Sequence, residues 1–376
     1  MKKILFLIND LGQGGAEKVL VNLVNNMDPE KFEIHVTALF GGGVNEQFLK
    51  PHIRYRTLLP GSFPGNSHVM KLLSPRMLHR MCVKEHYDIE VAYLEGPASR
   101  IISGCTEPDT KLVTWIHCTF RNEKQFAVGF RSPAEARAAY ARFHRRVFVS
   151  RDVMEAFRVF CPREPMTVCY NTNETARMQV LGREEIPADT FRPEEFKMIG
   201  TGKLIPVKGF DRLARIHQRL RREGYPVHTY LLGIGEEEQK LRTFAREQGI
   251  GDSFTLLGYQ TNPYAYVARS DLFVCSSHSE GFSTAATEAL IVGTPVCTTN
   301  VSGMKEMLGE HNEWGLVTDN DEEALYAGIK RLLDDPGLLA HYKNQAAIRG
   351  TTFSTENTVK AVEEMFSVML GAHNES

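Results

Sequence analysis

The chain has 376 residues, of which 42% are hydrophobic and 24% charged, and its formal net charge is −2 at pH 7. This length favours two domains, because a single core rarely grows beyond about 250–300 residues. The balanced charge gives no overall preference for nucleic acid or a membrane. The seven cysteines are scattered and form no Cys-x-x-Cys pair, which argues against a disulfide framework and a structural zinc site and favours a reducing cytoplasm.

The chain begins with a short apolar run, Ile4–Ile8, that stops at Asn9. The run is too short for an export signal or a membrane span, so we expect a buried first strand. A glycine-rich turn, Gly12–Gly15, and a helical pattern follow. Glycines after a strand let the backbone approach a ligand closely, although this spacing is not the dinucleotide-binding fingerprint.

Further apolar stretches predict a parallel sheet in each half of the chain. In the first half they cover residues 33–39, 53–58, 89–93, 111–116 and 146–149, and in the second half 196–200, 227–233, 254–257, 272–275 and 295–298. Helical patterns lie between many of them, and this alternation is typical of parallel strands covered on both faces. We therefore expect an α/β protein of two doubly wound domains.

The predicted domain border lies in residues 174–195, which are polar and contain proline. We interpret them as a linker between an N-terminal domain (1–173) and a C-terminal domain (196–353), followed by a C-terminal helix and tail (354–376). Ligands bind such sheets at the carboxyl ends of the strands. The Gly12–Gly15 turn, His117, the loop 202–208 and the stretch 280–288 all follow predicted strands, so we expect them to converge on a cleft.

The stretch from Val274 to Leu290 predicts a strand, a loop and a helix that Ser283 or Thr284 can cap. Unpaired N–H groups at a helix N-terminus suit a phosphate. Glu280 lies in the loop, and Glu288 lies about two turns along the helix at roughly 3.6 residues per turn. The alternative is a plain strand–helix junction with two solvated glutamates, and this stretch alone does not decide.

A second glycine-rich loop places Lys203 and Lys208 between a strand and a helix. Two ammonium groups near a helix N-terminus can neutralise a diphosphate without a metal, although two solvated lysines are the alternative. A further glycine turn, Gly233-x-Gly235, follows a strand and is weak evidence alone. His117 ends a predicted strand, where a lone histidine is more often structural, but the carboxyl end favours a function.

The sequence Asp319-Asn320-Asp321 has the form of a metal-diphosphate motif. Because a helix start follows directly, we interpret it as an N-cap and predict no metal site.

Basic and aromatic residues alternate between Lys111 and Arg146. The basic residues are Arg121, Lys124, Arg131, Arg137, Arg142, Arg145 and Arg146, and the aromatic residues are Phe120, Phe126, Phe130, Tyr140 and Phe143. Such a stretch suits an anionic membrane surface, where each cation contributes roughly 1 kcal/mol. A helix with a solvated basic face and a buried aromatic face is at least as well supported.

These motifs together resemble the retaining nucleotide-sugar glycosyltransferases of the GT-B fold, specifically glycosyltransferase family 4. The resemblance covers nearly the whole chain and rests on the order of the stretches 12–17, 202–211, 232–236, 279–288, 293–296 and 315–317. The stretch from Glu280 to Glu288 matches the Glu-x7-Glu signature of that family. The resemblance implies two Rossmann-like domains facing across a cleft, with the C-terminal helix crossing back to the N-terminal domain.

The resemblance also implies roles for individual residues. Glu288 would hold the ribose hydroxyls, and Glu280 and His117 would lie at the donor sugar. Lys208 would bind the diphosphate, and Lys203 stands where relatives usually carry arginine, so the charge is kept without the bidentate fork. The other expected donor-binding residues are Gly14, Gly15, Gly233, Gly281, Phe282, Ser283 and Thr284.

The implied activity is transfer of a hexose or N-acetylhexosamine from a nucleoside-diphosphate sugar, with a UDP-sugar favoured, to a hydroxyl acceptor. The anomeric configuration would be retained, and His117, Lys208 and Glu280 would be the catalytic residues. We expect a glycan or lipid-linked acceptor from bacterial surface glycan biosynthesis, no cofactor, no metal and no nucleic acid. The expected location is the cytoplasm, and residues 111–146 are the candidate contact with the inner leaflet of the plasma membrane.

Two alternatives stay open. One is a sugar-nucleotide epimerase of the same fold, and the other is a non-catalytic nucleotide-sugar-binding subunit of a partner transferase. A phosphorylase is set aside because it would need a pyridoxal-binding lysine and a far longer chain.

Overall fold

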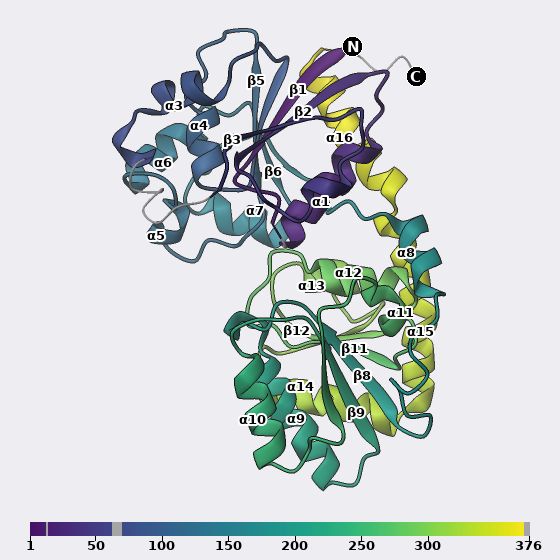
Figure 1. Ribbon diagram of the computed structural model, residues 1–376. Coiled ribbons are helices and arrows are strands. Elements are labelled where there is room, and N and C mark those ends of the chain that lie inside the picture. Colours follow the sequence, from purple (N-terminus) through teal and green to yellow (C-terminus); the bar gives the residue numbers. More distant parts are fainter. Residues whose placement is uncertain (13, 62–69, 372–376) are drawn as a thin grey trace. The chain divides into compact units, whose positions relative to one another are not determined.

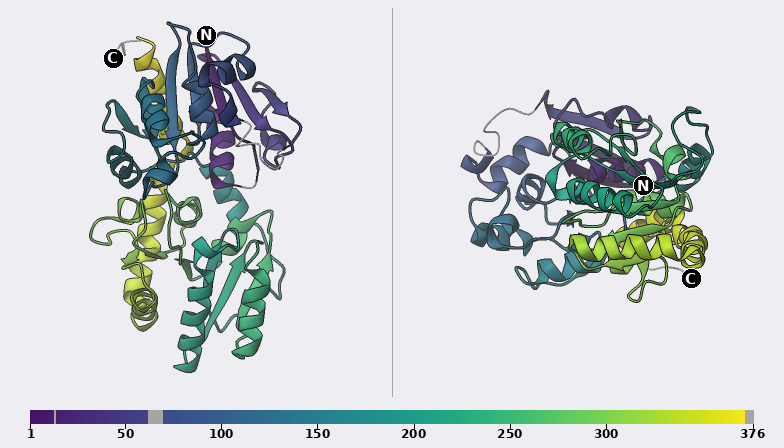
Figure 2. Two further views of the ribbon diagram at one scale, coloured as in Figure 1. Left: turned by 90° about the vertical axis from the view of Figure 1, so that its left-hand side faces the viewer. Right: turned by 90° about the horizontal axis from the view of Figure 1, so that it is seen from below.

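The computed structural model describes residues 1–12, 14–61 and 70–371 (Figure 1). The chain divides into two compact units, the first made of residues 1–173 with the C-terminal segment from residue 355, and the second of residues 174–354. In each unit, helices flank a parallel sheet, as two further directions of view also show (Figure 2). The predicted class of two doubly wound α/β domains is confirmed.

The sheet of the first unit has the strand order β3-β2-β1-β4-β5-β6-β7, and all pairings are parallel. Its strands are β1 (Lys2–Ile8), β2 (Phe32–Phe40), β3 (Arg54–Leu59), β4 (Ile89–Tyr93), β5 (Lys111–Ile116), β6 (Arg145–Phe148) and β7 (Met166–Val168). From β1 the sheet grows first toward β3 and then, starting with β4, in the opposite direction. The pair β1 and β4 is therefore the switch point, whose carboxyl edge is the usual ligand site in such sheets.

The C-terminal helix returns to the first unit, as expected. The helices of this unit are α1 (Gly15–Asn26), α3 (Pro75–Cys82), α4 (Pro97–Ile102), α5 (Glu123–Phe126), α6 (Pro133–Tyr140), α7 (Arg151–Arg158) and α16 (Thr355–Met369). The buried Phe366 of α16 packs with ring centroids 6.2 Å from Phe6 and 6.4 Å from Phe32. Apolar burial against β1 and β2 thus fixes a segment that is remote in sequence.

The second unit has the strand order β10-β9-β8-β11-β12-β13, again fully parallel. Its strands are β8 (Phe196–Thr201), β9 (Val227–Leu232), β10 (Phe254–Gly258), β11 (Leu272–Cys275), β12 (Val296–Thr299) and β13 (Leu316–Thr318). Its helices are α8 (Thr175–Gly182), α9 (Phe210–Arg222), α10 (Glu238–Glu247), α11 (Pro263–Val267), α12 (Thr284–Ile291), α13 (Met304–Leu308), α14 (Glu322–Asp334) and α15 (Pro336–Gly350). The switch point of this sheet lies between β8 and β11.

The stretch expected as a linker, 174–195, differs from that expectation because it contains α8. Met178 of this helix is 2% exposed and packs in one cluster with Tyr264 of α11 and Ile291 of α12. Asn262 also donates a hydrogen bond to the carbonyl of Leu181 at 3.0 Å. Because α8 is short and buries only one face, its few apolar residues do not form a recognisable helical pattern in the sequence. The polar residues around them led to the prediction of a linker.

Candidate functional site

The predicted lysine and glutamate of the second unit meet at its switch point. Lys208 ends the loop after β8, and its Nζ lies 2.7 Å from Oε1 of Glu280, 72 residues away in the loop after β11. The hydroxyl of Ser277 donates to the same oxygen at 2.5 Å. The side chains of Lys208 and Glu280 are 25% and 11% exposed. The carboxyl edge of this sheet therefore holds a cation that is fixed in place and still accessible.

Charge at this pair is set by its surroundings. Burial by itself lowers the pKa of Lys208, but the adjacent Glu280 carboxylate outweighs burial, and the pKa lies above its ordinary value. The ammonium group is thus charged at neutral pH. An anionic ligand here would bind an ammonium group that Glu280 already orients. Glu280 is itself held by the hydrogen bond from Ser277.

Glycines allow the loops at this edge to approach one another. Gly209 has φ +63°, and a Cβ atom there would lie 2.1 Å from the carbonyl oxygen of Ser276 in the loop after β11. Gly233 has φ +140°, and a Cβ atom there would lie 1.9 Å from the carbonyl oxygen of Gly202. Only glycine fits both the dihedral angles and the space, so these positions draw the loops after β8, β9 and β11 together.

Arg212 is a positioning residue that the sequence did not reveal. It is 3% exposed and donates from Nε to Ser276 O and from Nη2 to Ser277 O, both at 2.6 Å. It also donates to Oδ1 of Asn320 at 3.0 Å. The guanidinium group thus ties down the loop that leads to Glu280. Its main partners are carbonyl groups of a distant loop, which no local motif encodes.

The Asp319-Asn320-Asp321 motif has structural contacts. Asp321 Oδ1 accepts the N–H of Ala324 at 2.8 Å and caps α14, which confirms the N-cap interpretation. Asn320 binds Arg212 through its oxygen and donates from Nδ2 to His278 O at 3.2 Å.

Helix α12 begins as predicted, with Ser283 as its N-cap. The Ser283 hydroxyl accepts the N–H of Ala286 at 3.3 Å. Glu288 is the fifth residue of this helix, about one turn from its start, where its Oε1 accepts the phenol hydroxyl of Tyr264 at 3.4 Å. Glu280 and Glu288 therefore both belong to the second unit, and Tyr264 adds a contact to Glu288 that the spacing could not predict.

The remaining expected donor-binding residues lie on loops and helix starts. Gly281, Phe282 and Thr284 flank the cap of α12, with the Phe282 ring 5.6 Å from Phe353. Lys203 is exposed in the loop after β8 and forms no ion pair with the residues that the structure describes. In the first unit, Gly14 precedes α1 and Gly15 is its first residue.

His117 follows β5 in the first unit. Its Nε2 is buried and has no hydrogen-bond partner among the described residues. Burial lowers the pKa of His117 to about 3, so the imidazole is neutral at physiological pH. The backbone N–H of His117 donates to Glu95 Oε2 at 3.0 Å. The ring lies 4.7 Å from that of Tyr93, at the end of β4.

The aromatic side chains of the stretch between Lys111 and Arg146 are buried in the first unit. All five aromatic side chains are at most 4% exposed; they are Phe120, Phe126, Phe130, Tyr140 and Phe143. They pack on one another, with Phe126 and Phe130 both 5.3 Å from the Tyr140 ring. The aromatic residues therefore form core, as the structural alternative predicted, and these buried rings cannot reach a membrane surface.

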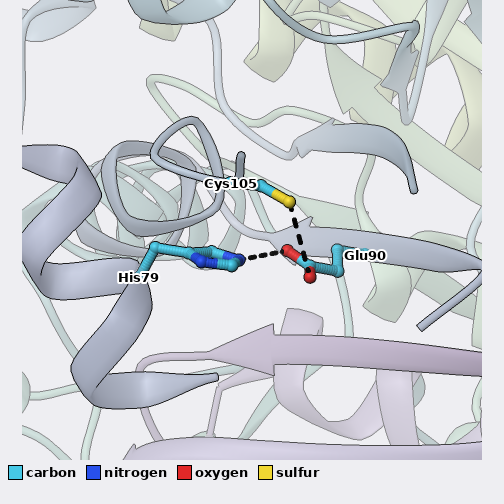
Figure 3. Close-up of side chains that lie close together, drawn as sticks. All are labelled: His79, Glu90 and Cys105. Atoms are coloured by element: carbon cyan, nitrogen blue, oxygen red, sulfur yellow. Dashed lines mark hydrogen bonds and ion pairs between the residues drawn. The ribbon is translucent and has the colours of Figure 1, made fainter. Parts of the chain in front are cut away.

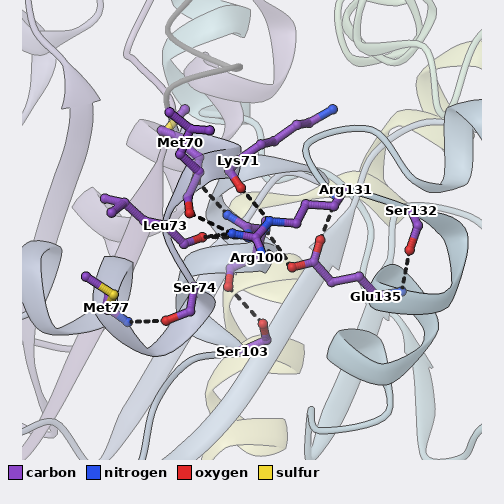
Figure 4. A network of polar contacts seen from close by, with 11 residues as sticks. Met70, Lys71, Leu73, Ser74, Met77, Arg100, Ser103, Arg131, Ser132 and Glu135 are labelled. Carbon is purple, nitrogen blue, oxygen red and sulfur yellow. Dashed lines mark hydrogen bonds and ion pairs between the residues drawn. The ribbon is translucent and has the colours of Figure 1, made fainter.

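Two arginines, Arg100 and Arg131, bind backbone carbonyl groups within the first unit (Figure 4). The buried Arg100 donates to the carbonyl oxygens of Met70 and Leu73, both at 2.8 Å, and to Glu135 at 2.9 Å. Arg131 donates to the carbonyl oxygen of Leu73 at 3.1 Å, and its backbone N–H donates to Glu135 at 2.6 Å. These contacts fix the segment before α3 against α4 and α6.

A separate polar cluster is buried beside β4 (Figure 3). His79 Nε2 lies 2.7 Å from Glu90 Oε2, and Cys105 Sγ lies 3.8 Å from Glu90 Oε1. Burial alone lowers the pKa of His79, but Cys105 and Glu90 raise it to about 9. Ligands of a tetrahedral zinc ion, bound at about 2.0–2.3 Å, lie more than about 3 Å apart. The shorter contact therefore describes a hydrogen-bonded ion pair that joins α3 to β4.

No helix within the described ranges is both long and apolar enough to span a bilayer.

Comparison with known proteins gives one family match in each unit. The model "Glycosyltransferase Family 4" matches residues 13–177, and "Glycosyl transferases group 1" matches residues 182–349. The N-acetylgalactosamine-N,N'-diacetylbacillosaminyl-diphospho-undecaprenol 4-alpha-N-acetylgalactosaminyltransferase of Campylobacter jejuni is 26% identical, over 99% of this chain and 100% of its own. The lipopolysaccharide core biosynthesis glycosyltransferase LpsD of Rhizobium meliloti is 24% identical over 94% of each chain.

The crystal structure of Anabaena HepE in complex with UDP is similar in fold, with a TM-score of 0.77 at 21% identity over 97% of this chain and 100% of that chain. The two family matches together span most of the sequence, one on each Rossmann-like unit. The N-terminal half of the chain therefore matches a Family 4 glycosyltransferase model, the C-terminal half matches a group 1 model, and the fold is similar to that of GT-B glycosyltransferases.

Proposed function

We propose that the protein is a retaining glycosyltransferase that moves a hexose or N-acetylhexosamine from a UDP-sugar to a hydroxyl group of a lipid-linked glycan. The observation that carries this proposal is the Lys208–Glu280 pair at the switch point of the second sheet, in the loop that leads into α12. The name of the Campylobacter relative describes an acceptor on diphospho-undecaprenol, and the Anabaena structure holds UDP. Both support the proposed substrate classes.

The donor binds the second unit in this proposal. The diphosphate accepts hydrogen bonds from the Lys208 ammonium group and from N–H groups at the start of α12, with Lys203 adding positive charge. Glu288, beside Tyr264, accepts hydrogen bonds from the ribose hydroxyls. Two cations and a helix dipole compensate the charge of a diphosphate, so we propose that the reaction needs no metal.

The reaction breaks the bond between the sugar C1 and the diphosphate, and the bonding electrons leave with the diphosphate. The acceptor oxygen forms the new bond to C1 on the same face, and the hydroxyl proton passes to an oxygen of the departing diphosphate. Lys208 stabilises the charge that grows on this leaving group, and stabilisation of this kind is usually the largest single contribution to catalysis. The neutral imidazole of His117 donates or accepts a hydrogen bond at a sugar hydroxyl.

Glu280 has a supporting role in this mechanism. A double displacement would require a free carboxylate nucleophile. Oε1 of Glu280 already accepts from Lys208 and Ser277, so its negative charge is engaged. Glu280 instead keeps the ammonium group in place and offers its second oxygen to the donor sugar.

The test is incubation with a panel of nucleotide sugars, with and without prenyl-diphosphate-linked sugars as acceptors. We expect UDP release that rises with acceptor, and a product whose anomeric proton shows retained configuration by NMR. Isomerised sugar nucleotide without transfer would instead identify an epimerase. UDP binding in a thermal-shift assay without any turnover would identify a non-catalytic subunit.

We propose that any contact with an anionic membrane surface is made by exposed basic side chains. With the aromatic rings buried, the exposed basic residues of the stretch remain as candidates; they are Arg121, Lys124, Arg131, Arg137 and Arg142, and Arg137 also pairs with Glu123. A lipid-linked acceptor would then place the protein at the cytoplasmic face of the membrane.

A further inference from the structure

The switch point of the first sheet also carries a carboxylate, on a turn of unusual backbone geometry. Strand β4 ends at Tyr93, and Leu94 then adopts φ +84°. This left-handed region is unfavourable for leucine, and such conformations gather at binding sites. Gly96 follows with φ +93° and ψ −122°, which glycine alone adopts readily. The turn places Glu95 beside the end of β5, where its Oε2 accepts the N–H of His117 at 3.0 Å.

Three buried polar atoms at the ends of β4 and β5 lack a partner among the described residues. The hydroxyl of Tyr93, the Nε1 of Trp115 and the Nε2 of His117 are all buried without a hydrogen bond to any described residue. The Tyr93 ring lies 4.7 Å from His117 and 5.2 Å from Trp115, so the three side chains form one aromatic group. Buried polar groups are nearly always satisfied in native proteins, and exceptions point to a missing partner. Tyr93 and Trp115 are at most 2% exposed, whereas His117 is less buried and its backbone N–H binds Glu95. A carboxylate beside a histidine whose Nε2 is unpaired suits a sugar hydroxyl.

Glu95 differs from Asp10, another carboxylate at this edge. Oδ1 of Asp10 accepts the N–H of Gly12 at 2.8 Å and so closes its own turn after β1. Glu95 is partly exposed. Its Oε2 accepts the backbone N–H of His117, and this bond fixes the direction in which Oε1 points. Cys118 is an exposed residue, but partial burial of its sulfur and the nearby Glu95 carboxylate raise the pKa of the thiol, which thus remains protonated and adds no charge. Glu95 therefore supplies a negative charge at the end of β5, while Glu17 of α1 acts on Tyr93 at the end of β4.

We infer that Glu95 binds the acceptor hydroxyl group that receives the sugar. This inference rests on the proposed transferase function and deepens it by assigning a residue to the acceptor. The carboxylate accepts a hydrogen bond from the hydroxyl and so turns a lone pair of the acceptor oxygen toward C1 of the donor. No covalent bond forms to Glu95, and the hydroxyl proton passes to the departing diphosphate as described above.

The test compares Glu95→Gln with wild type in three measurements. The amide oxygen of glutamine can still accept the His117 N–H, so we expect an unchanged melting temperature. Because the amide lacks the negative charge, we expect kcat/KM for a prenyl-diphosphate-linked N-acetylhexosamine to fall at least tenfold. UDP-induced thermal shift and hydrolysis of the UDP-sugar without acceptor stay within twofold of wild type. The matched control is Glu123→Gln, an exposed carboxylate of the same unit, for which we expect no change.

The outcomes separate the two proposals. An unchanged acceptor kcat/KM in Glu95→Gln, while wild type transfers sugar, overturns the role of Glu95 alone. An equal loss of donor hydrolysis and transfer also overturns it, because the residue would then act on the donor. A wild-type protein that neither binds nor releases UDP overturns the transferase proposal, and the role of Glu95 falls with it.

Discussion

Replacing Lys208 by alanine tests the electrostatic basis of the proposed reaction. The ammonium group lies 2.7 Å from Glu280 and would stabilise charge that develops on the departing diphosphate. Loss of one preorganised donor at such a position typically costs about 2.7–4 kcal/mol, or roughly 10²–10³ in kcat. The variant also leaves the Glu280 carboxylate facing the diphosphate without its counterion, which adds to the loss. We therefore expect kcat for UDP release to fall at least a hundredfold.

The assay must separate catalysis from folding. Removing one partner of a largely buried pair destabilises a protein by up to about 3 kcal/mol when the other charge is left unpaired. The double variant Lys208→Ala with Glu280→Gln removes that unpaired charge, so we expect its stability in urea to recover while kcat stays low. The control Lys240→Ala removes an exposed lysine of the same unit that pairs with Glu237, and we expect wild-type kinetics. A kcat of Lys208→Ala within threefold of wild type would refute the reasoning.

The remaining predictions concern the donor, metal, membrane and pH. Glu288→Ala removes a charge-assisted bond to a ribose hydroxyl and should weaken UDP binding by about 1.5–3 kcal/mol in calorimetry; an unchanged Kd would contradict this role. Activity should survive EDTA, and a loss restored by magnesium would show a metal requirement. The amount of protein that sediments with anionic vesicles should decrease as salt is added and should also decrease in the double variant Lys124→Glu/Arg137→Glu. If no protein binds the vesicles at low salt, the proposed association with the membrane surface is wrong. The folded-state pKa of His79, raised to about 9, means that its stabilising contribution is complete below its unfolded pKa near 6.5 and is lost as the pH rises through 9. The urea stability difference between wild type and His79→Gln should therefore shrink between pH 6 and pH 10, and a constant difference would refute the ion pair.

Local patterns in the sequence determined the architecture. Short apolar runs separated by helical stretches predict parallel strands covered on both faces, and both sheets have that form. Ser283 as the cap of α12 and Asp321 as the cap of α14 were also predictable, because a cap depends on residues within three positions. The helix α8 inside the expected linker was less accessible, since it is recognised only through its packing on α11 and α12.

Tertiary structure decided which of the candidate residues meet. Lys208 and Glu280 are 72 residues apart, and their contact arises because β8 and β11 are neighbours whose carboxyl ends share one edge. The sequence carries no sign of Arg212, because its hydrogen bonds go to carbonyl groups that every residue possesses. The left-handed turn before Glu95 is equally hidden, because it falls on Leu94, a residue that seldom adopts it. Strand order and backbone dihedral angles are properties of the folded chain, and they determine where the side chains that local patterns identify come together.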